Sequence, residues 1–355
     1  MKKKRIITIG EILLRLSSPI GELFKTTRSF NANYGGSEAN VAIALANMGV
    51  DTSFLTVLPN NDLSDAVVRV LRANNVDTSK IILSDGRLGT YYLQPGAASR
   101  ASKVIYDRAF SAFSEYDYSS LNLEEILSEY DWIHLSGITP ALSESCRHFT
   151  QKILEIAKSN EITISFDGNY RANLWDLETA RKTLTEYLPY INVLIGVEPF
   201  YIFDENGDAK VPFGTQPTYE QQKRTFDALE AKYPNIHAII KHNRISHSAS
   251  HNSLKVFLYY KGNSYESRSF DFDIVDRVGG GDALTAGFIY ALMHDMEPQQ
   301  IMDYSLATSV LKHTSNGDFS TFTSQEILPL CNSDYKYDVR RWWKKASNIC
   351  CRLFS

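Results

Sequence analysis

The feature that most constrains the fold is the regular alternation of short apolar segments with amphipathic helical segments. Helical patterns such as residues 63–73, 144–158 and 177–188 separate apolar segments of strand length, namely residues 5–9, 53–57, 132–135, 162–166, 193–195 and 237–240. This alternation favours a mostly parallel sheet with helices on both faces. The chain has 355 residues, of which 43% are hydrophobic, enough for one large α/β core. In such sheets, ligands bind beyond the carboxyl ends of the strands.

A run of three glycines near the C-terminus carries the strongest indication of chemistry. Gly279, Gly280 and Gly281 lead into Asp282 and an apolar helix expected over residues 283–293. Glycines let backbone N–H groups converge on an anion, and a helix start adds unpaired donors and a partial positive charge. A carboxylate in this first turn can accept a proton from a hydroxyl group while the N–H groups hold a phosphate. The pattern indicates phosphoryl transfer from a nucleotide to an alcohol; a tight connection with an aspartate helix cap is the alternative.

A second glycine pair precedes a helix near the N-terminus. Gly35 and Gly36 lead into an Ala-rich segment, and Gly49 is expected to end the helix that this segment forms. Asn40 lies one turn into the helix, where its amide could reach a polyol. An Ala-rich helix can also pack closely against a sheet.

Together the two motifs, Gly-Gly-x-x-x-Asn and Asp-x-x-Gly-x-Gly-Asp, resemble those of the PfkB (ribokinase-like) carbohydrate kinases in order and separation. The resemblance covers about residues 4–330. It is greatest to 2-keto-3-deoxygluconate kinases, on the segments Tyr106-Asp107-Arg108-Ala109, Phe166-Asp167-Gly168-Asn169-Tyr170-Arg171 and Ser248-Ala249-Ser250-His251-Asn252. It implies a three-layer ribokinase-like α/β kinase domain over residues 1–330 with a small β lid from about residues 11–35 and 88–114. It also implies a homo-oligomer formed through that lid.

The resemblance implies a role for each part of the site. Asp282 would be the general base, and the anion hole would be formed by Gly279, Gly280 and Gly281. The sugar acid would contact Gly35, Gly36, Asn40, Tyr91, Tyr106, Arg108 and Arg171. Guanidinium groups suit this substrate because they bind carboxylates through two parallel hydrogen bonds. A surface salt bridge is the alternative explanation for each arginine. The nucleotide would contact Arg244, Ser246, Ser248, Gly317 and Asp318.

The expected cofactors are ATP and Mg²⁺, and the resemblance leaves a monovalent cation open. Phosphoryl transfer needs a divalent ion to neutralise the phosphates. The Asn-x-x-Glu element that the family uses for Mg²⁺ and phosphate aligns with Val197-Glu198-Pro199-Phe200. Only Glu198 remains there as a candidate carboxylate.

Three functions fit these patterns. The first is ATP-dependent phosphorylation of the terminal hydroxyl of a sugar acid, 2-keto-3-deoxygluconate, to its 6-phosphate. The second is a kinase of the same family for a neutral ketose such as fructose. The third is a weakly active, kinase-fold protein that binds a sugar acid. The departure at Val197 and Phe200 favours the third, whereas Asp282 and its glycines oppose it.

Composition excludes other classes. A net charge of −4 gives no indication of nucleic-acid binding, and no apolar run reaches membrane-spanning length. The cysteines show no metal-binding spacing, as expected of free thiols in a cytoplasmic protein: Cys146, Cys331, Cys350 and Cys351. Residues 331–355 form a basic, aromatic C-terminal extension with helical spacing over residues 337–354. It is interpreted as a helix that docks on the protein itself, with membrane-surface or partner binding as the alternative.

Overall fold

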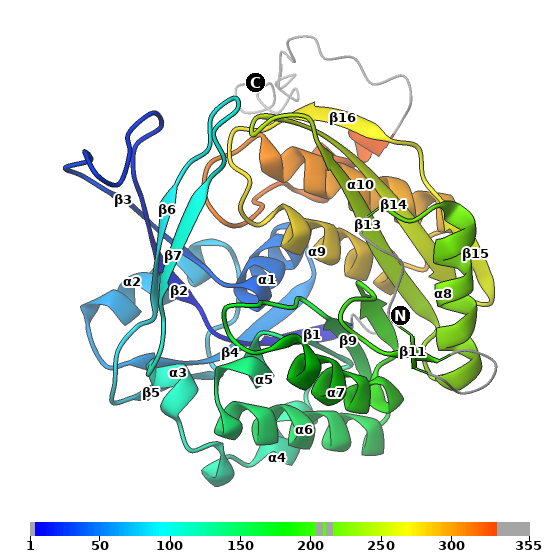
Figure 1. Cartoon of the computed structure of the whole chain (residues 1–355). Helices are drawn as coiled ribbons and strands as arrows, with labels where there is room; N and C mark the ends of the chain where they lie inside the picture. The colour runs from blue at the N-terminus through cyan, green and yellow to red at the C-terminus, as the bar shows by residue number, and fades with distance from the viewer. Residues whose placement is uncertain (1–3, 204–208, 211–215, 332–355) are drawn as a thin grey trace, which may run out of the picture.

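The computed structural model describes residues 4–203, 209–210 and 216–331. A ten-stranded sheet runs through its centre in the order β15-β14-β13-β10-β9-β8-β1-β4-β5, with β16 paired to β14 (Figure 1). Its strands are β1 (Arg5–Ile9), β4 (Asp51–Pro59), β5 (Ile81–Ser84), β8 (Trp132–Ser136), β9 (Thr163–Asp167), β10 (Val193–Ile195), β13 (Ala238–Ser246), β14 (His251–Tyr260), β15 (Asn263–Glu266) and β16 (Phe270–Asp273). The strands from β5 to β13 in this order pair in parallel, and those beyond β13 pair antiparallel. Each of the six predicted strands is present in this sheet, although β13 continues six residues beyond its predicted end, to Ser246.

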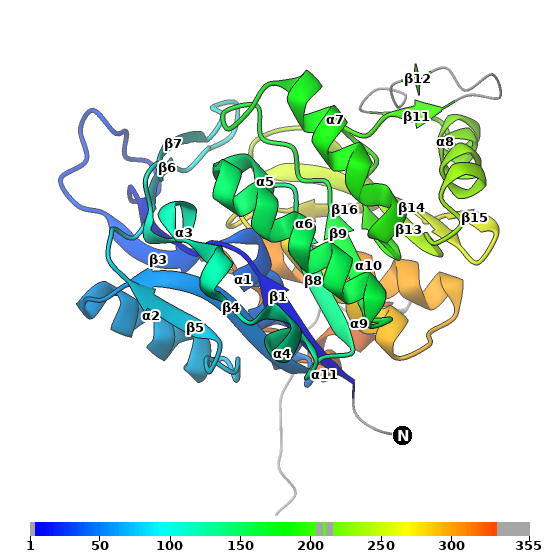
Figure 2. The same ribbon diagram turned by 90° about the horizontal axis from the view of Figure 1, so that it is seen from below.

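Helices cover both faces of the sheet, as the alternation predicted. Figure 2 shows α6 (Glu144–Ser159) and α7 (Leu177–Tyr187) on one side of the strands and α9 (Gly280–Met293) and α10 (Pro298–His313) on the other. The first side also carries α8 (Tyr219–Lys232), and the second also carries α1 (Ser37–Asn47) and α2 (Asp62–Ala73). Short helices complete the layers: α3 (Ala112–Glu115), α4 (Leu123–Leu127), α5 (Thr139–Leu142) and α11 (Ser324–Ile327). The fold class predicted from the sequence is therefore confirmed.

A separate four-stranded sheet forms the lid. Its strands are β2 (Leu13–Ser17), β3 (Asn31–Gly35), β6 (Thr90–Gln94) and β7 (Lys103–Asp107), in the order β3-β2-β6-β7. They project from one end of the main sheet (Figure 1). The central pair, β2 and β6, is parallel and joins two segments that the chain separates with α1, β4, α2 and β5. A further short pair is formed by β11 (Ile202–Phe203) and β12 (Ala209–Lys210).

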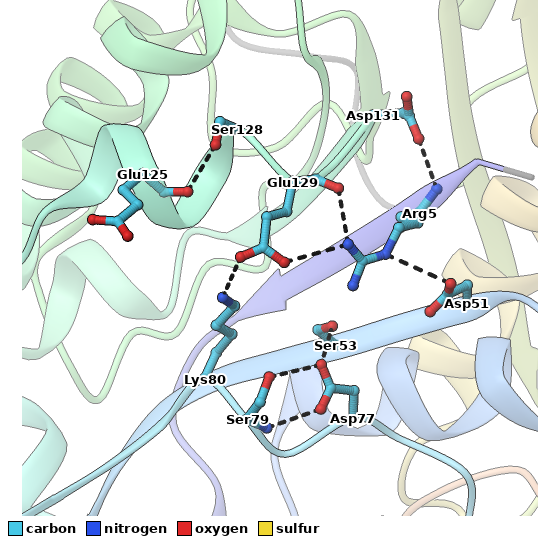
Figure 3. Close-up of polar contacts among 10 residues, drawn as sticks. All are labelled: Arg5, Asp51, Ser53, Asp77, Ser79, Lys80, Glu125, Ser128, Glu129 and Asp131. Atoms are coloured by element: carbon cyan, nitrogen blue, oxygen red, sulfur yellow. Dashed lines mark hydrogen bonds and ion pairs between the residues drawn. The ribbon is translucent and has the colours of Figure 1, made fainter. Parts of the chain in front are cut away.

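The amino ends of the strands are held by an ion-pair network, shown in Figure 3. Arg5 of β1 contacts Glu129 (3.3 Å) and Asp51 (3.5 Å), and its backbone N–H donates to Asp131. Lys80, which precedes β5, also contacts Glu129, at 2.6 Å. Because these side chains are partly exposed, each pair contributes at most about 1 kcal/mol. The network lies at the edge of the sheet opposite to the carboxyl ends of the strands, where ligands of such folds bind.

Within the described residues, no helix combines the length and apolarity needed to cross a bilayer. The predicted C-terminal extension, residues 331–355, lies outside the described residues except for Cys331, at the end of a short 3₁₀ helix (Leu328–Cys331).

Candidate active site

A cavity of about 570 Å³ lies beyond the carboxyl ends of β9 and β10, between the lid and the start of α9. Most of the site residues predicted from the sequence line it: Gly35, Gly36, Asn40, Tyr91, Tyr106, Arg108, Arg171, Glu198, Arg244, Gly279, Gly280, Gly281, Asp282 and Asp318. They come from the lid, from α1, from the ends of the parallel strands and from α9. Three predicted nucleotide contacts, Ser246, Ser248 and Gly317, do not line this cavity.

Asp282 occupies the first turn of α9, and both of its carboxylate oxygens are held from α1. The Oγ of Ser37 donates to Oδ1 (2.9 Å), and the Nδ2 of Asn40 donates to Oδ2 (2.7 Å). Asn169 in turn donates to the Oγ of Ser37 (3.0 Å). Burial raises the pKa of Asp282, and the bonds from Asn40 and Ser37 oppose this rise. The result is a carboxylate fixed in orientation and made more basic by desolvation.

The three glycines lie at the start of α9, and Gly279 adopts the left-handed conformation that favours glycine. Gly279 has φ +78°, and a Cβ there would lie 1.5 Å from the carbonyl oxygen of Asp318. No side chain of the described residues caps this terminus. The N–H groups of the first turn, which have no partner inside a helix, are therefore left for a ligand, and the partial positive charge favours an anion. A Cβ at Gly281 would meet only open space, whereas one at Gly280 would lie 2.1 Å from the ring of His313.

Two further acids lie behind Asp282. Asp167 lines the cavity, and burial followed by the negative charge of Asp282 raises its pKa to about 7. Glu38 in α1 accepts a hydrogen bond from Ser136 (2.6 Å), and burial raises its pKa to about 7. Because both groups resist ionisation, the negative charge beside Asp282 is smaller near neutral pH than the number of carboxyl groups suggests.

The arginines expected to bind a sugar acid differ in their surroundings. The Nε and Nη2 atoms of Arg108 are both directed at Oε2 of the buried Glu11, so this edge of the guanidinium is already used by the protein. Arg171 is exposed and lines the cavity. The ring of Tyr106 lies 5.9 Å from the Arg108 guanidinium carbon and 5.7 Å from the ring of Tyr91.

The expected nucleotide contacts are divided between two places. Arg244 lines the main cavity, its buried Nε has no hydrogen-bond partner in the described structure, and its Nη2 lies 3.5 Å from Nε2 of His313. Burial and the neighbouring Arg277 lower the pKa of Arg244 to about 10. Ser246 accepts a hydrogen bond from Arg277 (3.1 Å), another residue of the cavity wall. Neither arginine has a carboxylate partner among the described residues, so both cations can bind a phosphate.

Gly317 lines a second cavity, of about 460 Å³, which shares Arg277 and Val278 with the first. Ser248 lies in the β13–β14 turn, where its Oγ accepts from the N–H of Ser250 (3.2 Å). Asp318 is committed to the lid, because its carboxylate accepts from Arg15 (2.9 Å) and from the hydroxyl of Tyr91.

The described residues contain no cluster of three or more His, Cys, Asp or Glu side chains able to hold a metal ion. Glu198 lines the cavity and pairs with Lys241. Val197 and Phe200 are fully buried in the hydrophobic core. Their side chains thus cannot take the place of the polar metal-handling pair that the sequence alignment put at these positions. A Mg²⁺ ion can still fit here, because this ion keeps several waters and binds mainly through phosphate oxygens and one or two carboxylates.

Sequence reasoning missed the supporting residues. Ser37 and Asn169 orient Asp282, Glu11 occupies Arg108, and Arg277 joins the two cavities. Ser37 and Asn169 lie inside segments that carry the family resemblance, so their polar character was a usable signal. Glu11 carried none, because its partner lies 97 positions away.

The chain is similar to known carbohydrate kinases. Residues 3–199 match the model of the pfkB family carbohydrate kinases. The chain is 32% identical over 324 residues to a 2-dehydro-3-deoxygalactonokinase of Haloferax volcanii, covering 91% of this chain and 95% of that protein.

Solved structures are also similar to this chain. A 2-dehydro-3-deoxygluconokinase from Thermotoga maritima superposes with a TM-score of 0.86 at 37% identity, covering 92% of this chain and 99% of the other. A structure from E. coli in complex with ATP and Mg²⁺ shares the fold, with a TM-score of 0.75 at 20% identity, over 92% of this chain and 98% of that one.

Proposed function

Because the chain belongs to the pfkB family of carbohydrate kinases, we propose that it transfers the γ-phosphoryl group of ATP to the terminal hydroxyl of 2-keto-3-deoxygluconate. The observation that carries this proposal is the placement of Asp282 in the uncapped first turn of α9, in one cavity with Arg108 and Arg171. A proton acceptor, an anion site and cations for a carboxylate are thus available together.

The residues of the chain have distinct tasks in this reaction. Asp282 accepts the proton of the sugar hydroxyl as its oxygen forms the new bond to phosphorus and the bond to the ADP oxygen breaks. The N–H groups of Gly280 and Gly281 hold the transferring phosphoryl group at the positive end of α9. Glu198 is the carboxylate that would hold Mg²⁺, and this ion would supply positive charge to neutralise the phosphates. Arg244 and Arg277 bind the remaining phosphates, and Ser246 orients Arg277.

The carboxylate of the sugar is bound by Arg171 and by the Nη1 edge of Arg108, since Glu11 takes up the other edge. Tyr106 contributes an exposed ring and hydroxyl group from the lid, beside Tyr91. Gly35, Gly36 and Asn40 lie at the end of the cavity where Asp282 is, so the sugar lies with its hydroxyl end there and its acid end at the arginines. A neutral ketose would leave Arg171 and the Nη1 edge of Arg108 without a carboxylate to bind, which disfavours it.

A second candidate substrate is 2-keto-3-deoxygalactonate, which differs from the first at the configuration of C4. The relative from Haloferax volcanii, whose name specifies this acid, supports it. The arginines and Asp282 would act on both acids in the same way, so discrimination depends on the groups near C4.

The test is a coupled assay of ADP formation by the full chain with the two sugar acids, fructose and no sugar, with and without K⁺. We expect sugar-dependent turnover with at least one acid at a kcat/KM well above that for fructose. A product one phosphate heavier and substituted at C6 confirms the transfer. A higher kcat/KM for fructose contradicts the sugar-acid assignment. ATP turnover that no sugar stimulates contradicts the proposed kinase reaction.

We further propose that the lid forms the contact of a homo-oligomer. One face of the lid exposes the apolar side chains of Ile105 and Phe30, which both lie beside Tyr92 of β6. A second copy that covers this face would remove their apolar surface from water. Light scattering after size-exclusion chromatography should give twice the monomer mass or more, and Ile105→Lys should reduce it. A monomeric wild-type chain would contradict this assembly.

A further inference from the structure

A buried arginine of the lid contacts both loops that flank the anion site. Arg15 lies on β2, is only 3% exposed, and uses all three of its nitrogens. Its Nη2 donates to Asp276 (2.6 Å), its Nη1 donates to Asp318 (2.9 Å), and its Nε donates to Ser17 (2.7 Å). A guanidinium group that is bonded through all three nitrogens is a rigid, geometrically specific link.

The two carboxylates are themselves parts of the turns beside the glycines. Asp276 accepts from the N–H groups of Val278 and Gly317, each at 3.1 Å, and so ties residues 276–278 to residues 317–318. The backbone of Asp318 lies directly against Gly279, and its carboxylate lies against Gly35. A shift of Arg15 would therefore be transmitted to the first residues of α9 and to the sugar side of the cavity.

The charges around Arg15 balance. Lys312 is fully buried, donates to the carbonyl oxygen of Ser315 (3.3 Å), and is attracted by Asp276 and Asp318. Two cations thus face two carboxylates, and Tyr91 of β6 bonds the second carboxylate from the lid. A buried cluster of this kind keeps its geometry only while every member is present.

We infer that Arg15 is a positioning residue that couples the lid over the sugar to the geometry of the anion site at Gly279, Gly280 and Gly281. This inference rests on the proposed kinase function. Lid residues Tyr91 and Tyr106 hold the sugar, while Asp276 and Asp318 hold the turn that receives the phosphoryl group. Arg15 fixes the position of the lid relative to this turn, so that the sugar hydroxyl group reaches Asp282 only when the anion site is formed.

The experiment compares two variants with the wild type. Arg15→Lys keeps the positive charge but loses the planar guanidinium group, and Arg15→Met loses both. Arg5→Lys is the matched control, because Arg5 is also an ion-paired strand residue but lies at the opposite edge of the sheet. Calorimetry measures the Kd of ADP with and without the saturating sugar acid. In the wild type and in Arg5→Lys, we expect the sugar to tighten ADP binding by about fivefold or more, the usual range of coupling between sites.

In Arg15→Lys, the ratio of the ADP Kd without the sugar acid to the ADP Kd with it should fall to within about twofold of unity. The kcat should fall by about tenfold or more, while the KM for the sugar changes less. A purely structural role would lower the melting temperature and leave both the ratio and kcat unchanged. Wild-type coupling and kcat in Arg15→Lys, or a wild type without coupling, would overturn the inference.

Amide hydrogen exchange tests the same inference without any sugar. The N–H groups of Val278 and Gly317, which bond to Asp276, should exchange at least about tenfold faster in Arg15→Lys than in Arg5→Lys. If Arg15→Met fails to fold, Arg15→Lys still supplies this measurement. Unchanged exchange overturns the inference even if a sugar acid is phosphorylated, and the absence of sugar phosphorylation by the wild type overturns only the proposed function.

Discussion

Replacing Asp282 with asparagine separates proton transfer from the shape of the site. Asparagine has almost the same size, and its Oδ1 can accept the bond from Asn40 that Oδ2 of the aspartate accepts at 2.7 Å. Its Nδ2 then faces the Oγ of Ser37, which already accepts from Asn169. A hydroxyl oxygen has two lone pairs, so Ser37 can accept both bonds. The amide donors of Asn40 and Asn169 therefore keep their partners, whereas the hydroxyl hydrogen of Ser37 loses its acceptor together with the basic lone pair.

The expected loss of rate follows from the loss of the basic lone pair. General-base catalysis contributes about 10²–10⁴-fold, which corresponds to about 2.7–5.5 kcal/mol in the barrier. Folding should be affected little. Burial already disfavours the ionised form of Asp282, as its raised pKa shows. The free energy of unfolding of Asp282→Asn should thus stay within about 1 kcal/mol of the wild-type value, because the variant loses two charge-assisted bonds but no longer buries a charge.

The assay combines initial rates, ADP binding by calorimetry and thermal melting. Asp227→Asn, the same change at an exposed ion pair on α8, serves as the control and should behave like the wild type. A kcat within about tenfold of the wild-type value would refute the assignment of Asp282 as base. A large loss of ADP affinity or of melting temperature would show instead that the first turn of α9 had collapsed, which contradicts the exchange of partners described above.

Four further expectations follow from the same contacts. Arg171→Lys should raise the KM for the sugar acid by about 5–150-fold (1–3 kcal/mol) in initial-rate assays, since an ammonium cannot bind a carboxylate in two parallel bonds; an equal rise for fructose would contradict carboxylate recognition. Glu198→Gln should raise the free Mg²⁺ needed for half-maximal activity by several-fold, about 1 kcal/mol of lost attraction, and an unchanged Mg²⁺ titration would exclude Glu198 from metal handling. Gly280→Ala should lower the free energy of unfolding by about 1–3 kcal/mol through its clash with the His313 ring, and His313→Ala in the same chain should recover part of this loss in denaturant unfolding, whereas strictly additive losses would contradict the clash. Burial raises the pKa of Glu38 to about 7, so its contribution to stability is complete below its unfolded pKa and is lost as pH rises through the folded value; Glu38→Gln should reduce the decline in unfolding free energy between pH 5 and 8 by up to about 1.4 kcal/mol per pH unit, and an unchanged pH profile would contradict it.

The layers of the fold were predictable because the pattern of apolar residues within each segment indicates a strand or a helix. The period of apolar residues marks β1, β8 and β10, and the glycine at position 49, with φ +94°, ends α1 as expected. The lid sheet was predictable only through the resemblance. Its four strands come from two distant segments, and β7 is exposed along its whole length, so no apolar alternation reveals it. The extra length of β13 comes from its hairpin with β14, which is a pairing rather than a propensity.

The residues of the candidate site were predictable from the sequence, but their side-chain partners were not. Local chemistry pointed to the three glycines and Asp282, and the structure brings them into one cavity with both predicted arginines. What the sequence did not contain was the identity of side-chain partners. Glu11 occupies one edge of Arg108, and Arg15 binds Asp276 across 261 positions. The roles of the site residues stay predictions until the variants above are measured.

The burial of Val197 and Phe200 decides how the metal hypothesis can be tested. The match of a polar motif to these positions predicts a weakened metal site, and both side chains are buried in the core. Installing Asn and Glu there would bury polar groups without partners, at a cost of about 1–3 kcal/mol each. Such a double variant would report on folding rather than on Mg²⁺.

The parallel pairing of β2 with β6 has a consequence for protein engineering. The lid is not a single insertion that can be cut out at two points, because α1, β4, α2 and β5 lie between its two halves in the chain. A chimaera that exchanges substrate preference between two relatives must therefore graft both segments at once. It must also carry over the acids that receive Arg15, which lie near the opposite end of the polypeptide. Exchanging one hairpin alone would leave a parallel strand edge without its neighbour and a guanidinium group without its carboxylates.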